Sequence, residues 1–167
     1  MAPKISLDTI ESFLAQKRIA IVGMSRKRPH VSASLFEELC RRGHEVFPVN
    51  PNIAMMMGQR CFARIQDIEP APDAALLLTS PAVTNSVVRD CADAGVKRIW
   101  MYRGGGQGSV SAEAIEFCQE NGIEVVPGHC PFMFLDPVRS IHRFHRFFVK
   151  LSGRYPQSAK CANGTPI

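Results

Sequence analysis

Short apolar runs rich in Val, Ile and Leu alternate along this chain with longer segments of helical spacing. The runs have the length of strands that are buried on both faces of a sheet, and they lie at residues 19–22, 45–49, 74–78, 98–101 and 123–126. The helical segments lie before and between them, at residues 7–14, 34–42, 83–94 and 111–121. This alternation predicts an α/β fold with a Rossmann-like, doubly wound parallel sheet, because parallel strands need helical crossovers.

Ligands of such sheets bind at the carboxyl ends of the strands, near the point where the strand order reverses. Five loops follow the predicted strands and are the candidate binding segments: residues 23–30, 50–52, 79–83, 102–109 and 127–132. Residues 52–72 are irregular, with one short strand expected around Cys61 and Phe62. The search for function therefore concentrates on the five loops.

The positive charge of the chain is confined to its last part. The 167 residues carry 20 Lys and Arg against 15 Asp and Glu, a net charge of +5. Residues 1–135 contain 14 of each sign, so the whole excess belongs to the last 32 residues. We expect a neutral Rossmann-like domain over residues 1–135, a basic C-terminal helix over 136–152 and a disordered tail over 153–167.

Several classes of protein are disfavoured. A transmembrane helix needs about 18 consecutive apolar residues, and the sequence has no such run. The N-terminal residues do not resemble a secretory signal, and the six cysteines form no C-x-x-C pair of the kind that binds zinc. We therefore expect a cytoplasmic protein with reduced thiols and no metal site.

The loop after the first strand has features of a phosphate-binding turn and reads Gly23-Met24-Ser25-Arg26-Lys27-Arg28-Pro29. A glycine at this place lets backbone N–H groups approach a phosphate, and the following helix N-terminus adds a favourable dipole. Three consecutive cations suit an additional phosphate monoester. The alternative that stays open is a solvated basic turn without a ligand.

A nicotinamide dinucleotide is the less favoured ligand, although an NAD(P)-dependent oxidoreductase with an atypical site remains the alternative function. Ser25 stands where the dinucleotide fingerprint has its second glycine, and no third glycine follows. An NAD site also ends its second strand with Asp or Glu, to hold the ribose hydroxyls. This chain has Asn50 there, followed by Pro51.

Four short motifs, taken in order, resemble the small stand-alone CoA-binding proteins, whose domain is similar to the N-terminal domain of the succinyl-CoA synthetase α subunit. The motifs span the neutral domain and are Ile19-Ala20-Ile21-Val22-Gly23-Met24-Ser25, Val49-Asn50-Pro51, Trp100-Met101 and Gly128-His129-Cys130-Pro131. The resemblance implies a protein that binds CoA or acyl-CoA in a binding or sensing role. It does not carry over the phosphorylated histidine of the synthetases, which lies in a second domain.

The resemblance also implies roles for individual residues. Gly23 and Ser25 would contact the CoA phosphates, and a cation would pair with a phosphate charge from Arg26, Lys27 or Arg28. Two further segments would border the nucleotide, one formed by Asn50 and Pro51 and the other by Thr79, Pro81 and Val83. Met24 stands where such proteins often carry alanine, and we expect its larger side chain to narrow the turn.

Cys130 is the one candidate for a catalytic nucleophile. It follows the last strand in a loop that faces the predicted site, and a thiolate there could attack a thioester. A structural Cys-Pro turn is the favoured interpretation, because sequence neighbours such as His129 rarely have the geometry of a base. The sequence shows no catalytic constellation, so we expect a binding protein rather than an enzyme.

The basic segment over residues 136–152 has four cations on one helical stripe, namely Arg139, Arg143, Arg146 and Lys150. A solvated helix face, an anion site and a homo-oligomer contact through this helix all stay open. Nucleic acid is disfavoured, because no recognised binding module accompanies the stripe. A membrane surface is disfavoured as well, because protein is expected to cover the apolar face of the helix.

Overall fold

The computed structural model describes residues 5–27 and 30–135 of the chain. The predicted basic helix, the predicted tail and Arg28 lie outside these residues. In chain order the elements are α1 (Leu7–Leu14), β1 (Arg18–Val22), α2 (Val31–Arg41), β2 (Glu45–Val49), β3 (Met55–Met56), β4 (Gln59–Arg60), the 3-10 helix η1 (Ile65–Asp67), β5 (Ala74–Leu77), α3 (Pro81–Asp93), β6 (Arg98–Tyr102), α4 (Ala112–Glu120), β7 (Glu124–His129) and the 3-10 helix η2 (Pro131–Met133).

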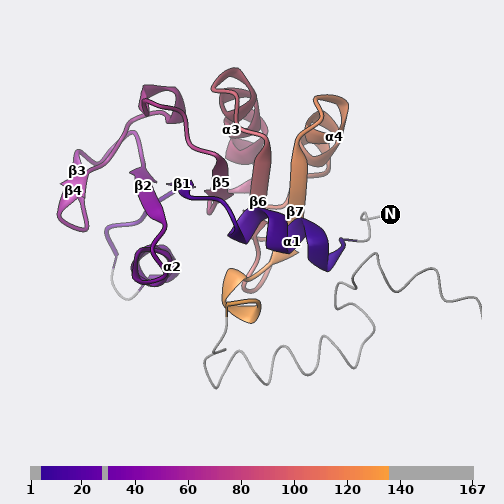
Figure 1. Ribbon diagram of the computed structural model, residues 1–167. Helices are drawn as coiled ribbons and strands as arrows, with labels where there is room; N and C mark the ends of the chain where they lie inside the picture. The colour runs from indigo at the N-terminus through magenta and orange to yellow at the C-terminus, as the bar shows by residue number, and fades with distance from the viewer. Residues whose placement is uncertain (1–4, 28–29, 136–167) are drawn as a thin grey trace, which may run out of the picture.

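Five strands form one sheet in the order β2-β1-β5-β6-β7, and every neighbouring pair is parallel. Helices α1 and α2 cover one face of the sheet and α3 and α4 cover the other (Figure 1). The crossover through α2 leads from β1 to one edge, whereas α3 and α4 lead from β5 to the opposite edge. The predicted Rossmann-like, doubly wound parallel sheet is confirmed, with its switch point between β1 and β5.

The sheet is buried on both faces because β5 carries apolar side chains at every position and β1 and β6 do so after their first residue, which is an arginine in each. All four residues of β5, from Ala74 to Leu77, have no exposed surface. On the α1 face, Phe13 packs edge-on against Trp100 with ring centroids 5.2 Å apart. On the other face, α3 and α4 bury small residues, among them Cys91 and Cys118. Two apolar layers therefore sandwich the sheet.

Some element boundaries differ from the sequence prediction. Helix α2 begins at Val31 rather than residue 34, because the side chain of His30 caps it. Helix α3 begins at Pro81 rather than residue 83, since proline is favourable in a first turn. The short strand expected around Cys61 and Phe62 lies just before them: β4 pairs with β3 in a hairpin, and Phe62 makes an isolated bridge to Val49.

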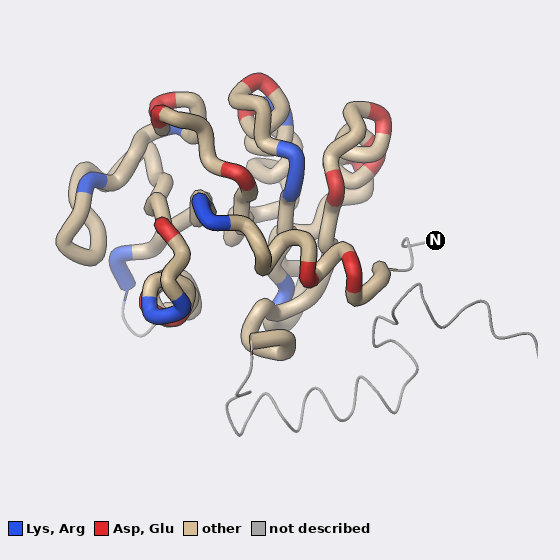
Figure 2. Tube along the Cα trace, viewed as in Figure 1, with Lys and Arg blue, Asp and Glu red and all other residues tan. Residues whose placement is uncertain are grey.

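Charged residues lie around the periphery of the domain, and Lys and Arg occupy the turn that precedes α2 (Figure 2). Within the described part of the chain, no helix has the length and apolar character that a membrane crossing needs.

Candidate functional site

The turn after β1 is built around one close backbone contact. Gly23 has a φ of +93°, in the left-handed region that L side chains rarely adopt. Its N–H donates to the carbonyl of Val49 at the end of β2, with an N···O distance of 3.0 Å. A Cβ atom added here would lie 2.9 Å from the carbonyl carbon and oxygen of Leu78, which follows β5. Only glycine fits, so the turn lies against the backbone that follows the neighbouring strand.

Asn50 braces this turn from the end of β2. Its Nδ2 donates to the carbonyl of Met24 over 2.7 Å, and its Oδ1 accepts from the N–H of Asn52 over 2.8 Å. Its own N–H donates to the carbonyl of Phe62. Both ends of the side-chain amide are thus occupied in holding the backbone. Asn50 therefore positions the turn, and the adjoining Pro51 is exposed.

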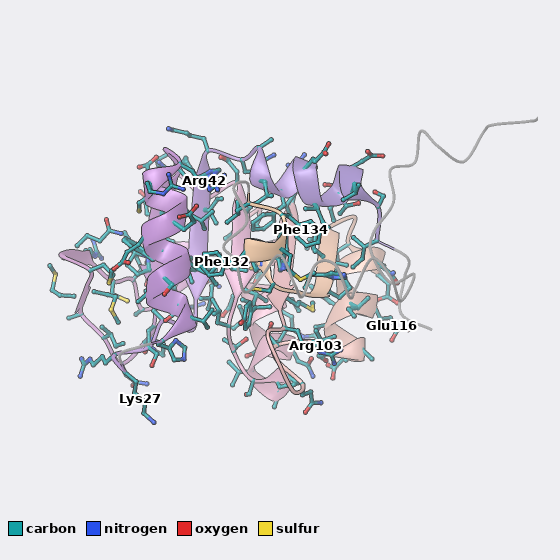
Figure 3. The ribbon with its side chains drawn as sticks, turned by 90° about the horizontal axis from the view of Figure 1, so that it is seen from below. Lys27, Arg42, Arg103, Glu116, Phe132 and Phe134 are labelled. Carbon is teal, nitrogen blue, oxygen red and sulfur yellow. The ribbon has the colours of Figure 1, made fainter. Side chains whose placement is uncertain are left out.

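The polar residues of the turn lie at its exposed side. The Oγ of Ser25 accepts from the N–H of Lys27 at 3.2 Å, which closes the turn on itself. The guanidinium of Arg26 donates to the carbonyl of Asn52 at 3.1 Å. Both cations are exposed, and Lys27 points away from the body of the protein (Figure 3). Neither is paired with a carboxylate within the described residues, so both charges face solvent.

The predicted second wall begins directly after β5. The hydroxyls of Thr79 and the fully buried Thr84 lie 2.7 Å apart, which fixes the start of α3. Pro81 is partly exposed in the first turn of that helix, and Val83 is 47% exposed. The parallel strands therefore bring Gly23, Asn50 and Thr79 together at the carboxyl ends of β1, β2 and β5. This placement agrees with the order of the motifs along the chain.

Met24 does not narrow the turn, and the expectation that it would is wrong. Its side chain is only 1% exposed and belongs to the core on the α2 face of the sheet. The methionine therefore anchors the turn to the core. The exposed side of the turn is left to the backbone and to Ser25.

The loop after β6 adds one cation that the sequence did not single out. Ser109, which is buried, donates through Oγ to the carbonyl of Leu77 at 2.8 Å and holds this loop against β5. Arg103 lies exposed in the loop, and its charge contributes to lowering the pKa of His129. Tyr102 precedes it and Gly104 to Gly106 follow it, and this glycine run indicates a close approach of the backbone to a ligand and a flexible turn equally well.

Cys130 lies in an environment that favours the neutral thiol. It is 5% exposed, and burial raises the pKa of its thiol despite a hydrogen bond with Tyr102. Burial is the main cause that raises the pKa of Tyr102 to about 12, and the neighbouring Cys130 adds to it. The Nδ1–H of His129 donates to the carbonyl of Pro127 at 3.0 Å, and burial lowers the pKa of this imidazole. The arrangement fits a structural turn rather than an activated nucleophile.

Two residues that the sequence analysis passed over lie directly behind the turn. The Oγ of Ser32 accepts the N–H of Ser25, and the ring of His30 contacts both the hydroxyl and the N–H of Ser32. Histidine is not a usual helix cap, so its role could not be found from residue type. Among the residues that the structure describes, no group of three or more His, Cys, Asp or Glu side chains could hold a metal ion.

The sheet order and the glycine turn after β1 define a Rossmann-like α/β domain. Residues 17–136 match the family described as the CoA binding domain, which covers most of this chain. The protein therefore belongs to the CoA-binding domain family, and the resemblance drawn from the four motifs is confirmed.

Relatives with this domain include much longer enzymes. An ADP-forming acetate–CoA ligase of Methanocaldococcus jannaschii is 27% identical over 81 residues, which are 48% of this chain and 12% of the ligase. A second such ligase, from Archaeoglobus fulgidus, is 26% identical over 117 residues, covering 65% of this chain and 17% of the ligase. An uncharacterised protein of Bacillus subtilis is 25% identical over 114 residues, which are 68% of this chain and 82% of that protein. This chain thus spans less than a fifth of each ligase.

Solved structures share the fold. A hypothetical protein from Pyrococcus horikoshii superposes with a TM-score of 0.70 at 26% identity, covering 76% of this chain and 87% of its own. The dinucleotide-forming acetyl-coenzyme A synthetase 1 of Candidatus Korarchaeum cryptofilum gives a TM-score of 0.60 at 24% identity, covering 71% of this chain and 27% of the synthetase. The similarity to the first protein covers most of both chains.

The close contact at Gly23 can be tested with a matched pair of glycines. Gly23→Ala introduces both a disfavoured φ and a clash with the backbone of Leu78, whereas Gly43→Ala at φ +87° meets no atom within 4 Å. We expect Gly23→Ala to lower the free energy of unfolding in urea by about 1–3 kcal/mol more than Gly43→Ala. Equal losses in the two variants would contradict the assigned contact.

The state of Cys130 can be tested by alkylation of the native protein. Iodoacetamide at pH 8 should modify Cys40 at least about tenfold faster than Cys130, because Cys40 is exposed whereas Cys130 is buried. Peptide mass spectrometry over time measures both rates. Full modification of both residues after denaturation is the control, and equal native rates would argue for an accessible, reactive Cys130.

Proposed function

We propose that this protein binds CoA or acyl-CoA at the carboxyl edge of its sheet, with the phosphates on the turn after β1. The observation that carries the proposal is the glycine turn at the switch point, beside which lie two exposed cations that have no carboxylate partner among the described residues. A phosphate is the chemical group that the two cations attract, since charge-assisted hydrogen bonds from Arg26 and Lys27 would stabilise it. Membership of the CoA-binding domain family supports CoA as the nucleotide.

The end of β2 favours CoA over a nicotinamide dinucleotide. Asn50 uses both ends of its side-chain amide to hold backbone groups of Met24 and Asn52. These bonds fix its side chain against the turn, and it offers the ribose hydroxyls no carboxylate. The family match gives the oxidoreductase alternative no support. In the proposed complex Asn50 and Pro51 border the nucleotide, and Thr79, Pro81 and Val83 form the second wall.

The proposed role is binding or sensing rather than catalysis. The candidate nucleophile Cys130 is buried with a raised thiol pKa, and the neighbouring His129 holds a backbone carbonyl instead of the thiol. We therefore assign the residues at this edge of the sheet a nucleotide-binding task.

Isothermal titration calorimetry tests this function with a matched pair of charge variants. CoA should bind the unmodified protein at least about tenfold more tightly than NAD or NADP does. Arg26→Gln combined with Lys27→Gln should weaken CoA binding about tenfold or more, because charge-assisted hydrogen bonds are lost.

The control combines Arg41→Gln with Arg42→Gln, which removes the same charge at the opposite end of α2 (Figure 3). This variant should bind CoA as the unmodified protein does. Equal weakening in both double variants would indicate attraction by net charge alone. Dinucleotide binding as tight as that of CoA would overturn the assignment.

A further inference from the structure

The turn that the proposed function assigns to CoA is held from behind by a short hydrogen-bond chain. The N–H of Ser25 donates to the Oγ of Ser32 at 3.2 Å. The same Oγ lies 2.8 Å from the Nδ1 of His30, and the N–H of Ser32 points to that Nδ1 at 3.2 Å. Ser32 has no exposed surface, so water cannot replace these partners. The backbone at Ser25 is therefore linked through Ser32 to one ring nitrogen.

The direction of these bonds fixes the protonation state of the ring. A backbone N–H can only donate, so the Nδ1 of His30 must accept from Ser32, and the imidazole is neutral with its proton on Nε2. The Ser32 hydroxyl can then donate to Nδ1 while its oxygen accepts from Ser25. A proton on Nδ1 would face the N–H of Ser32 and would remove the acceptor that both Ser32 donors use.

We propose that His30 is a positioning residue for the CoA turn, and that it holds the turn only in its neutral form. Protonation of the half-buried ring breaks the cap of α2 and leaves a buried donor of Ser32 unsatisfied, which releases the backbone at Ser25. The stabilisation is thus present while the ring is neutral and is lost when acid protonates it, because a protonated Nδ1 cannot accept a hydrogen bond. This inference takes its ligand, CoA, from the proposed function. The hydrogen-bond chain from His30 through Ser32 to Ser25 does not depend on that function.

Among the described residues, the charged groups near this ring are few. Arg26 and Lys27 lie on the same turn, both exposed, and Arg28, which follows them in the sequence, lies outside the described residues. Residues 50–58, which pack beside the turn, contain no charged side chain, and neither do residues 31–36 of α2 or residues 130–135. An imidazolium added beside two cations would by itself draw an anionic ligand closer. The sign of the pH dependence therefore separates the two effects, because loss of the positioned turn weakens binding in acid.

Two histidines of the domain form a matched pair for the test. His44 places its Nδ1 at 2.8 Å from the carbonyl of Gln16, where the ring nitrogen donates, so protonation of that ring keeps the bond. Asparagine is a good helix cap, so His30→Asn retains an acceptor for the Ser32 N–H. Its side chain cannot titrate. His44→Asn removes a histidine without touching the turn.

The first measurement needs no ligand. Amide hydrogen exchange of Ser25 and Ser32 is compared at pH 8.0 and 5.5, after correction for intrinsic rates. Both amides should lose protection in acid in the unmodified protein and in His44→Asn, and keep it in His30→Asn. Protection that responds to pH in the same way in all three proteins would overturn the inference, whatever the ligand.

The second measurement is CoA affinity at the same two pH values. The dissociation constant of the unmodified protein and of His44→Asn should rise about tenfold more in acid than that of His30→Asn, the factor expected for one lost buried hydrogen bond. The ligand's own phosphate also titrates near pH 6, but it does so equally in every variant. An equal rise, or tighter binding in acid, would overturn the positioning role. If no variant binds CoA at either pH, the proposed function fails, and the exchange result alone decides whether His30 holds the turn.

Discussion

The contact between the backbone of Gly23 and that of Leu78 is the constraint on which the site depends. It joins the ends of β1 and β5, the two strands from which the chain departs toward opposite edges of the sheet. A side chain here would separate the two loops, because its Cβ atom would lie 2.9 Å from the Leu78 carbonyl. With glycine at residue 23 the two loops meet. The turn, the end of β2 and the start of α3 then lie side by side at the carboxyl ends of the strands.

The turn is supported from every protein-facing side and left open on the remaining one. Met24 fills the core below it, Asn50 holds its carbonyl from β2, and Ser32 with His30 holds its N–H from α2. These contacts use neutral side chains, so the cations on the exposed side have no carboxylate partner within the described residues. A rigid backbone with uncompensated positive charge is suited to an anionic ligand without a large change of shape.

Much of the fold could be predicted from the sequence, because fully buried parallel strands appear as unbroken apolar runs and helices keep their own period. Gly23 and Asn50 could be found as well, since their places at strand ends follow from topology. The start of α2 could not, because His30 caps it through a ring nitrogen that residue preferences do not favour. The side-chain direction of Met24 was equally inaccessible, since a turn residue can face the core or the ligand. Arg103 lies in the loop 102–109 that the strand order nominates, but nothing in the residue pattern of that loop distinguishes it as a binding residue.

The central claim, that CoA occupies the edge formed by these loops, is tested most directly by amide chemical shifts during a titration with CoA. The account predicts that the largest changes fall on residues 23–27, 50–52 and 79–83, at the carboxyl ends of β1, β2 and β5. Amides at the opposite edge of the sheet, such as those of Lys17, Gly43 and Gly95, should keep their positions. Changes centred on that opposite edge, or a spectrum that CoA leaves unaltered, would contradict it.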